Sequence, residues 1–287
     1  SRALYESSSP LGQLSVVENL QVPFRHAPGL SIATRHIPSE QLAVFRDGGG
    51  MSAITRWDGS VPPAYLGETT SALPYHLLDS PGVLVLGAGT GAGVLQAILH
   101  GAASIDAVEL DPGMADLVGD RFAEYAGHVY ENPRVSLHIG EARGYAARGQ
   151  ARYDLVQIGL LDSFAVSGSG VQALIENDLY TVEAIRDYLD LLNPGGILSI
   201  TRWVKLPPRD SLKLVNTVVA ALREAGVGVP ADRGALIREW RSASLIVLYG
   251  ELGVAGSAWL GGFSRCRCCG VVVVRVRGAV RAVGAGR

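Results

Sequence analysis

The sequence predicts an α/β fold: a doubly wound, mostly parallel sheet of seven strands, with a small β-rich domain before it. Three observations predict this class. From Pro81 to about residue 249, short apolar runs of the kind buried on both faces of a parallel sheet alternate with helical stretches. A glycine-rich turn follows the first of these runs. Before residue 79 the chain instead carries short strand-like runs between glycine turns, without strong helical periodicity.

Residues 1–78 are predicted to form the β-rich N-terminal domain, on the turn signals that separate their apolar runs. Residues 47–50 and 57–60 contain Asp-Gly and Gly-Gly pairs, where glycine accepts a positive φ without steric cost. Such pairs between apolar runs are typical of hairpins. The residues leave open an alternative, an extended arm that packs on the next domain.

Residues 79–250 are predicted to form the α/β domain. Strands are expected at 83–86, 105–109, 135–139, 154–158, 196–201, 235–239 and 244–249, the last two as an antiparallel pair. Helices are expected at 94–100, from Pro112, near Tyr145, over 181–192 and over 209–225. Alternation of strands and helices at this spacing is typical of a doubly wound sheet.

Residues 251–287 differ in composition from the rest. The formal net charge of the chain is −2, but residues 1–250 hold 19 basic and 26 acidic residues, a net of −7, whereas the tail carries +5 and all three cysteines. The tail is open to three interpretations: a strand and arm with a basic patch for an anionic partner, a Cys-x-Cys-Cys metal or redox element, or a non-native, disordered ending from a shifted reading frame. The skew of 23 arginines to 2 lysines favours the last.

Several function classes are not expected from the sequence. Residues 1–250 lack a basic stripe, which argues against nucleic acid, and the six histidines lie too far apart to predict a metal site. No apolar run reaches the roughly 18–20 residues of a membrane span. Residues 1–250 contain no cysteine, so we expect a cytoplasmic protein, and a homodimer is an open interpretation. The chain starts at Ser1 rather than Met, which leaves open that it is an excised or processed fragment of a larger protein.

A cofactor site is predicted at the turn after the first strand of the α/β domain. Gly87, Gly89 and Gly91 lie between that strand and the first helix, where a tight turn lets a ligand approach the backbone. Glu109 ends the second strand, twenty residues beyond Gly89, and an acid there can accept hydrogen bonds from both ribose hydroxyls. The pattern predicts a nucleoside-type cofactor; the alternative is a structural turn beside a solvated acid.

Further segments resemble the spermidine synthase (aminopropyltransferase) family, within the class I S-adenosylmethionine-dependent methyltransferase fold. The segments that carry this resemblance are 83–91, 108–112, 132–143, 153–156, 179–184 and 192–198. The resemblance implies S-adenosylmethionine or its decarboxylated form as cofactor, with Glu109 on the ribose and Glu141 and Ala142 near the adenine. It also implies Tyr65 in the substrate site and a polyamine or similar small amine as acceptor, with which the acidic balance of residues 1–250 is compatible.

The catalytic loop departs from the family pattern. In the family, the strand that begins Tyr-Asp leads into a loop with two acids three residues apart. Here Gly159 stands at the first of these positions and Asp162 at the second. Asp162 is therefore the candidate catalytic base, with a solvated loop acid or helix cap as the alternative. Two other functions stay open: a methyltransferase on the same scaffold, and a non-catalytic nucleotide-binding module.

Overall fold

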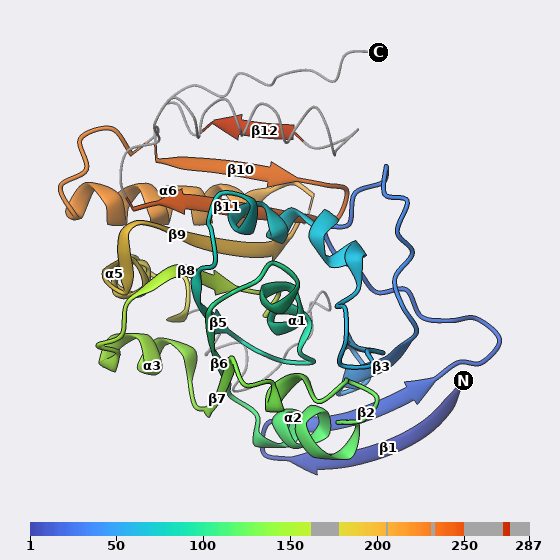
Figure 1. Cartoon of the computed structure of the whole chain (residues 1–287). Coiled ribbons are helices and arrows are strands. Elements are labelled where there is room, and N and C mark those ends of the chain that lie inside the picture. The colour runs from blue at the N-terminus through green and yellow to red at the C-terminus, as the bar shows by residue number, and fades with distance from the viewer. Residues whose placement is uncertain (162–177, 205, 231–232, 250–271, 276–287) are drawn as a thin grey trace.

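The computed structural model describes residues 1–161, 178–204, 206–230, 233–249 and 272–275 of the 287-residue chain (Figure 1). Its strands form two sheets: one of four strands near the N-terminus and one of eight strands in the rest of the chain. The predicted catalytic loop acid, Asp162, and most of the tail lie outside the described residues. A domain boundary at 78/79 stays a prediction.

The N-terminal sheet is antiparallel throughout and confirms that this part of the chain is β-rich. Its strands follow each other in chain order: β1 (Arg2–Ser9), β2 (Gly12–Glu18), β3 (Gln41–Arg46) and β4 (Gly50–Thr55). The β3–β4 turn contains Asp47, at a φ of 49°, as the Asp-Gly pair predicts. The Asp47 carboxylate accepts a hydrogen bond from the Gln13 backbone N–H (2.8 Å), which ties this turn to β2.

The larger sheet contains the seven predicted strands. They are β5 (Gly82–Leu86), β6 (Ser104–Glu109), β7 (Val135–Ile139), β8 (Tyr153–Ile158), β9 (Leu192–Trp203), β10 (Gly234–Arg238) and β11 (Ser242–Leu248). Strands β7, β6, β5, β8 and β9 run parallel to one another in that spatial order, and β11 and then β10 continue the sheet antiparallel. An eighth strand from the tail, β12 (Val272–Arg275), pairs with β10 at the edge.

Helices cover both faces of the larger sheet. The α-helices that the described residues form are α1 (Ala92–Leu99), α2 (Pro112–Asp116), α3 (Ala142–Arg148), α5 (Val182–Asp190) and α6 (Arg209–Glu224). Two 3₁₀ segments, η1 (Ala64–Glu68) and η2 (Thr70–His76), link the N-terminal sheet to β5. None of the described helices has the length and apolar character that a membrane crossing requires.

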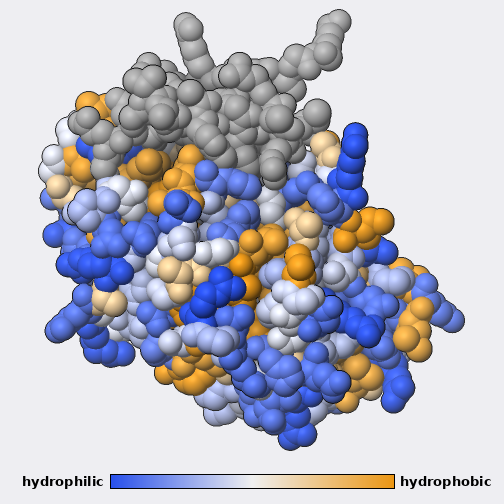
Figure 2. Space-filling model, in the orientation of Figure 1, coloured by the Kyte–Doolittle hydropathy of each residue, from blue (hydrophilic) through white to orange (hydrophobic). Residues whose placement is uncertain are grey.

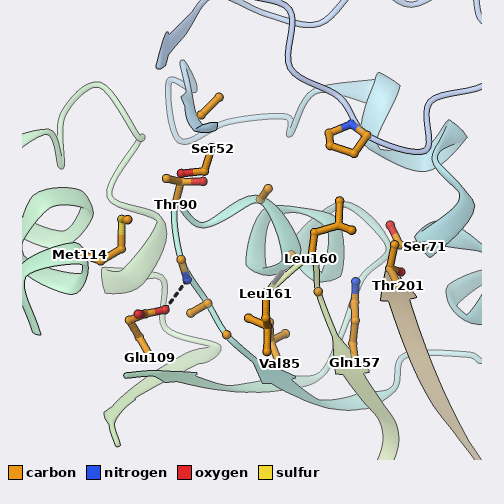
Figure 3. A pocket seen from close by; sticks show the side chains of 18 of the residues that line it. Ser52, Ser71, Val85, Thr90, Glu109, Met114, Gln157, Leu160, Leu161 and Thr201 are labelled. Atoms are coloured by element: carbon orange, nitrogen blue, oxygen red, sulfur yellow. Dashed lines mark hydrogen bonds between the residues drawn. The ribbon is translucent and has the colours of Figure 1, made fainter. Parts of the chain in front are cut away.

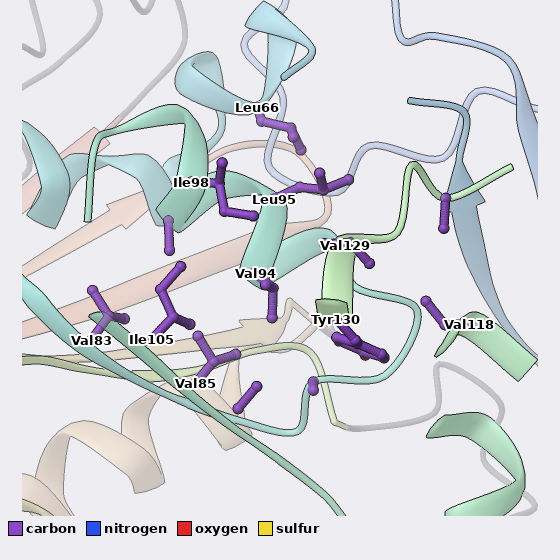
Figure 4. Packing of buried hydrophobic residues seen from close by; sticks show 14 of the residues in the cluster. Leu66, Val83, Val85, Val94, Leu95, Ile98, Ile105, Val118, Val129 and Tyr130 are labelled. Atoms are coloured by element: carbon purple, nitrogen blue, oxygen red, sulfur yellow. The ribbon is translucent and has the colours of Figure 1, made fainter. Parts of the chain in front are cut away.

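The alternation of side chains along β5 divides the core in two. Val83 and Val85 pack into a cluster with α1 and the N-terminal sheet, as Figure 4 shows around Val94. Leu84 and Leu86 pack into a second cluster with α3, α5 and α6. Because a strand side chain alternates between faces, a continuous apolar run is what a strand buried on both sides requires.

Two helices begin immediately after a strand because an acid caps them. The Asp111 carboxylate accepts from the Gly113 N–H (2.9 Å) at the start of α2, where Pro112 occupies the first turn. Glu141 accepts from the N–H groups of Arg143 (2.7 Å) and Gly144 (2.6 Å) at the start of α3. These caps fix the chain where it leaves the carboxyl ends of β6 and β7.

The face drawn in Figure 2 is mostly hydrophilic, with hydrophobic areas between the charged side chains. Large exposed hydrophobic residues include Leu20, Val22 and Ile37, in the segment that connects β2 to β3. Single exposed apolar side chains of this kind are common on folded proteins.

Candidate cofactor and acceptor site

A cavity of about 380 Å³ lies at the carboxyl ends of β5, β6, β8 and β9. Ligands in open α/β sheets bind at these strand ends, and the volume falls within the usual range for small-molecule sites. Strands β3 and β4 of the N-terminal sheet and segment η1 contribute the opposite wall. The cavity therefore lies between the two sheets and needs both of them to be complete.

The glycine-rich turn forms one wall of the cavity. Gly87 has a φ of +80°, and a Cβ there would lie 1.9 Å from Cδ2 of Leu161, so only glycine fits. At Gly89 the nearest atom of the described residues to a Cβ would be the Gly87 carbonyl oxygen, at 3.9 Å, so these residues leave space for a ligand. The Tyr130 hydroxyl donates to the Gly89 carbonyl (2.8 Å) and fixes the turn. Gly91 precedes α1 with a φ of +86°.

Glu109 is buried at the tip of β6 and faces this turn (Figure 3). Its Oε2 accepts from the Gly89 N–H (2.7 Å) and its Oε1 from the Asp111 N–H (2.9 Å). Burial raises the pKa of the Glu109 carboxyl, while these two N–H groups act in the opposite direction. Each oxygen keeps a further lone pair, so the carboxylate can accept two more hydrogen bonds from a ligand.

Two more predicted residues, Glu141 and Ala142, line the same cavity after β7. Both carboxylate oxygens of Glu141 already accept backbone N–H groups of α3, so this side chain is held against its own helix. The structure therefore brings Glu141 and Ala142 to the cavity wall with Glu109. Their role at an adenine ring stays a prediction.

Tyr65 lines the cavity from η1 and is almost fully buried. Its hydroxyl lies 3.0 Å from Thr55 Oγ1 and accepts from Nε2 of Gln41 (3.4 Å). Burial raises the pKa of the Tyr65 phenol, which stays neutral at physiological pH. A substrate-binding role for Tyr65 is compatible with this position and stays a prediction.

Gly159 lines the cavity just after β8. Among the atoms of the described residues, the one nearest to a Cβ at Gly159 would be the Gly87 carbonyl oxygen, at 4.0 Å. Asp162 lies beyond the described residues, and its role as catalytic base stays a prediction.

A buried chain of amides and hydroxyls, missed by the sequence reasoning, forms the floor of the cavity. Oε1 of Gln157 on β8 accepts from the Tyr75 hydroxyl, and its Nε2 donates to Oε1 of Gln96 on α1 (2.9 Å). Nε2 of Gln96 donates in turn to the Leu66 carbonyl (2.7 Å) and to Thr69 Oγ1 (2.8 Å). The sequence feature that could have indicated this chain is a glutamine, Gln96 or Gln157, inside each of two otherwise apolar runs.

Two more residues that the sequence reasoning missed reach the cavity from distant parts of the chain. Thr201 on β9 lies 2.9 Å, oxygen to oxygen, from Ser244 on β11. His26 enters from the β2–β3 connection, where Gln41 holds its backbone by two hydrogen bonds (2.6 and 2.9 Å). Burial, and secondly the charge of Arg241, lowers the pKa of His26 to about 4. The imidazole is therefore neutral at physiological pH.

An ion pair lies at the end of the cavity that contains Glu109. The Arg46 guanidinium on β3 lies 2.7 Å from the Asp111 carboxylate and also donates to the Leu11 carbonyl (3.0 Å). Asp111 is the cap of α2, so this pair joins the N-terminal sheet to the strand tip that carries Glu109. The charge of Arg46 also favours the ionised form of Glu109.

A match to known proteins agrees with this geometry. Residues 69–225, more than half of the chain, match the family model described as the spermine/spermidine synthase domain. The chain is 30% identical over 116 residues to a polyamine aminopropyltransferase of Korarchaeum cryptofilum, covering 40% of this chain and 33% of that protein. It is 31% identical over 134 residues to a spermine synthase of Arabidopsis thaliana, covering 46% and 34%. The chain thus spans less than half the length of these relatives.

Solved structures show the same fold at low sequence identity. A spermidine synthase in complex with the transition state analogue AdoDATO has a TM-score of 0.59 at 16% identity, covering 89% of this chain and 76% of that one. A probable spermidine synthase from Corynebacterium glutamicum has a TM-score of 0.59 at 13% identity, covering 100% and 96%. Likeness at this identity establishes the fold and leaves the chemistry to be argued from the site.

Proposed function

The chain belongs to the spermine/spermidine synthase family, and on this premise we propose that it is a transferase that moves an aminopropyl group from an S-adenosyl cofactor to a small amine. One observation carries the proposal: the buried Glu109 carboxylate, fixed by the Gly89 N–H at 2.7 Å, faces a cavity at the strand ends. A buried acid with free lone pairs beside an open glycine turn fits a ribose diol.

The described residues fit such a cofactor. Glu109 would accept the two ribose hydroxyls, the backbone at Gly89 would lie along the ligand, and Glu141 and Ala142 would border the base. When bound, the sulfonium of the cofactor supplies an alkyl group together with a neutral thioether as leaving group. Transfer then depends mainly on holding the acceptor nitrogen in line, unprotonated, beside the alkyl carbon.

We propose decarboxylated S-adenosylmethionine as the cofactor, since the AdoDATO complex of the related fold carries a transition state analogue of spermidine synthase. We propose Asp162 as the base that takes the proton of the acceptor amine, because it stands at the second acidic position of the family pattern, whereas Gly159, at the first, cannot take a proton. A polyamine-type acceptor would enter from the side of Tyr65 and Gln157, opposite Glu109.

Calorimetry with S-adenosylmethionine, its decarboxylated form and methylthioadenosine tests the cofactor, and product analysis with putrescine tests the reaction. We expect tighter binding of the decarboxylated form and release of methylthioadenosine. Release of S-adenosylhomocysteine from S-adenosylmethionine would instead indicate a methyltransferase. Binding without turnover of any acceptor would indicate a nucleotide-binding module.

The role of Asp162 has its own test. Asp162→Asn should lower the turnover number at least a hundredfold and leave the dissociation constant for methylthioadenosine within threefold, since a general base typically contributes roughly 10²–10⁴ in rate. An unchanged turnover number would assign Asp162 to the loop alone.

A further inference from the structure

Residues 25–40, which lead into β3, form a loop whose two ends are held together; we call it the β2–β3 loop. At its base the Gln41 side chain pairs with a backbone unit as a strand would: Nε2 donates to the His26 carbonyl (2.9 Å) and Oε1 accepts from the His26 N–H (2.6 Å). Beside this pair, the Arg25 guanidinium donates to the Pro38 carbonyl (2.9 Å). Compact surface loops with their ends close together are frequently functional.

The β2–β3 loop lies against the 3₁₀ segments η1 and η2, of which η1 carries Tyr65. The Ser31 N–H donates to the Glu68 carbonyl (3.0 Å). The Thr70 N–H donates to the Gly29 carbonyl (2.9 Å). Gly29 has a φ of +80°, and a Cβ there would lie 2.6 Å from Thr70 Oγ1, so this close contact requires glycine. The loop is therefore held by Gln41 at its base and by η1 and η2 along its length.

This arrangement brings His26 to the end of the cavity away from Glu109. His26 lines the cavity together with Thr201 and Trp203, which lie on one face of β9. In Figure 3, Thr201 lies on the side of the cavity opposite Glu109. The His26 ring meets the Trp203 ring edge-on, with centroids 6.3 Å apart and planes at 61°. The imidazole thus borders the part of the cavity that is remote from the proposed ribose site.

The glutamine that holds His26 also holds a second residue of this wall. Nε2 of Gln41 lies 3.4 Å from the Tyr65 hydroxyl oxygen and 3.3 Å from Thr55 Oγ1. Gln41 is itself buried. One buried amide therefore sets the positions of His26 and Tyr65, two cavity residues from different segments of the chain.

The His26 imidazole has the chemistry to receive an amine. Burial, and secondly the charge of Arg241, lowers the pKa of His26 to about 4, so the ring is neutral at physiological pH. A neutral imidazole has one nitrogen with a lone pair and one N–H. The distal nitrogen of a polyamine, the one that does not react, carries N–H groups whether or not it is protonated. The lone pair of His26 can therefore accept a hydrogen bond from it.

Building on the proposed function, we propose that His26 is a specificity-determining residue that accepts a hydrogen bond from the distal nitrogen of a polyamine acceptor, and that Gln41 is the positioning residue that holds it there. The reacting amine lies toward the cofactor, and the distal nitrogen reaches the β2–β3 loop. This contact selects acceptors with a second nitrogen over monoamines of the same length.

Putrescine and butylamine test this selectivity, because they share one carbon chain and differ only in the distal nitrogen. With decarboxylated S-adenosylmethionine, His26→Leu should lower the ratio of kcat/KM for putrescine to that for butylamine at least tenfold, about the contribution of a hydrogen bond to a charged group. His26→Gln, which keeps a lone-pair acceptor, should lower the ratio less. Arg35→Leu, at an exposed residue of the same loop, is the control and should leave the ratio within threefold. An unchanged ratio in His26→Leu, or equal losses in His26→Leu and His26→Gln, would overturn the proposal.

A second variant tests the positioning role. Gln41→Met fills a similar space without an amide, so it should lower the same ratio at least fivefold while the dissociation constant for methylthioadenosine stays within threefold. Because Gln41 acts through His26, the double variant with His26→Leu should lose less than the product of the two single losses. A full product, or a Gln41→Met protein that does not fold, would overturn the positioning role and assign Gln41 to stability alone.

A binding measurement separates this proposal from the proposed function. In the presence of methylthioadenosine, calorimetry gives the dissociation constants of putrescine and butylamine without turnover, for the unmodified protein and for His26→Leu. If no amine yields methylthioadenosine from the decarboxylated cofactor, the proposed function fails, while the change in the ratio of dissociation constants still decides the role of His26. An equal ratio in the two proteins, or no binding of either amine, would overturn the proposal.

Discussion

Replacement of Glu109 by alanine is the sharpest test of the cofactor site. The carboxylate is 7% exposed and accepts from the N–H groups of Gly89 (2.7 Å) and Asp111 (2.9 Å), so its position is fixed before a ligand arrives. A hydrogen bond to a charged group contributes about 1.5–3 kcal/mol. The loss of two ribose hydrogen bonds should therefore weaken binding by about 3–6 kcal/mol, or roughly 10²–10⁴-fold in the dissociation constant.

The assay is calorimetric binding of methylthioadenosine, with a thermal melt to show that the variant folds. Glu124→Ala, a change at an exposed glutamate of the same domain, is the control and should bind as the unmodified protein does. Glu109→Ala should also lower the melting temperature, because two backbone N–H groups lose their acceptor. A folded Glu109→Ala protein whose dissociation constant stays within threefold of the unmodified value would refute the assignment of Glu109 to the ribose.

The ionisation of Glu109 adds a pH signature to this test. Burial raises the pKa of the carboxyl above its ordinary value of 4.5. Ribose hydroxyls donate to the ionised form, so affinity should be full at neutral pH and fall on acidification, with a midpoint above 4.5. Glu109→Gln should abolish this dependence, and a persistent midpoint in that variant would assign it to another group.

Three further predictions follow from the geometry. Gly87→Ala should lower cofactor affinity at least tenfold by calorimetry, because the new Cβ at φ +80° would lie 1.9 Å from Leu161; unchanged affinity would contradict the tight turn. Tyr130→Phe should weaken binding about fivefold, since the Gly89 carbonyl loses a hydrogen bond worth about 1 kcal/mol; an equal dissociation constant would show that the turn holds without it. The pKa of His26 is about 4 in the folded protein and has its ordinary value of 6.5 in the unfolded chain. As the pH falls, the imidazole is therefore protonated in the unfolded chain before it is protonated in the folded protein. The free energy of unfolding should therefore lose about 3 kcal/mol between pH 6.5 and 4, and denaturant titrations of His26→Asn should lack that component.

The order of elements was predictable from the sequence because local patterns encode it. Each strand of the larger sheet is an apolar run between turn residues, and burial on both faces, as at Val83 and Leu84, is what makes such runs continuous. Element ends were less predictable. Strand β9 begins at Leu192 rather than near residue 196, because pairing of Leu192 with Tyr153 and an irregularity in register extend it through a Pro-Gly-Gly turn signal.

The glycine turn and Glu109 were predictable from the sequence, whereas the buried polar contacts of the cavity were not. The glycine turn and Glu109 follow from a fixed spacing within one strand–helix–strand unit, so the chain itself carries the signal. The hydrogen bond between Tyr75 and Gln157 joins residues that lie 82 positions apart in the sequence. The hydrogen bond between Thr201 and Ser244 joins two neighbouring strands, β9 and β11. A single polar residue in an apolar run does not indicate its partner until the strand register is known, so these two contacts became visible only in the structure.

The most direct test of the proposed activity is product analysis after incubation of the protein with decarboxylated S-adenosylmethionine and a small amine acceptor. Aminopropyl transfer predicts stoichiometric release of methylthioadenosine together with an acceptor heavier by one aminopropyl group, and loss of both products in Glu109→Ala. Release of S-adenosylhomocysteine from S-adenosylmethionine, with no methylthioadenosine from the decarboxylated form, would contradict it.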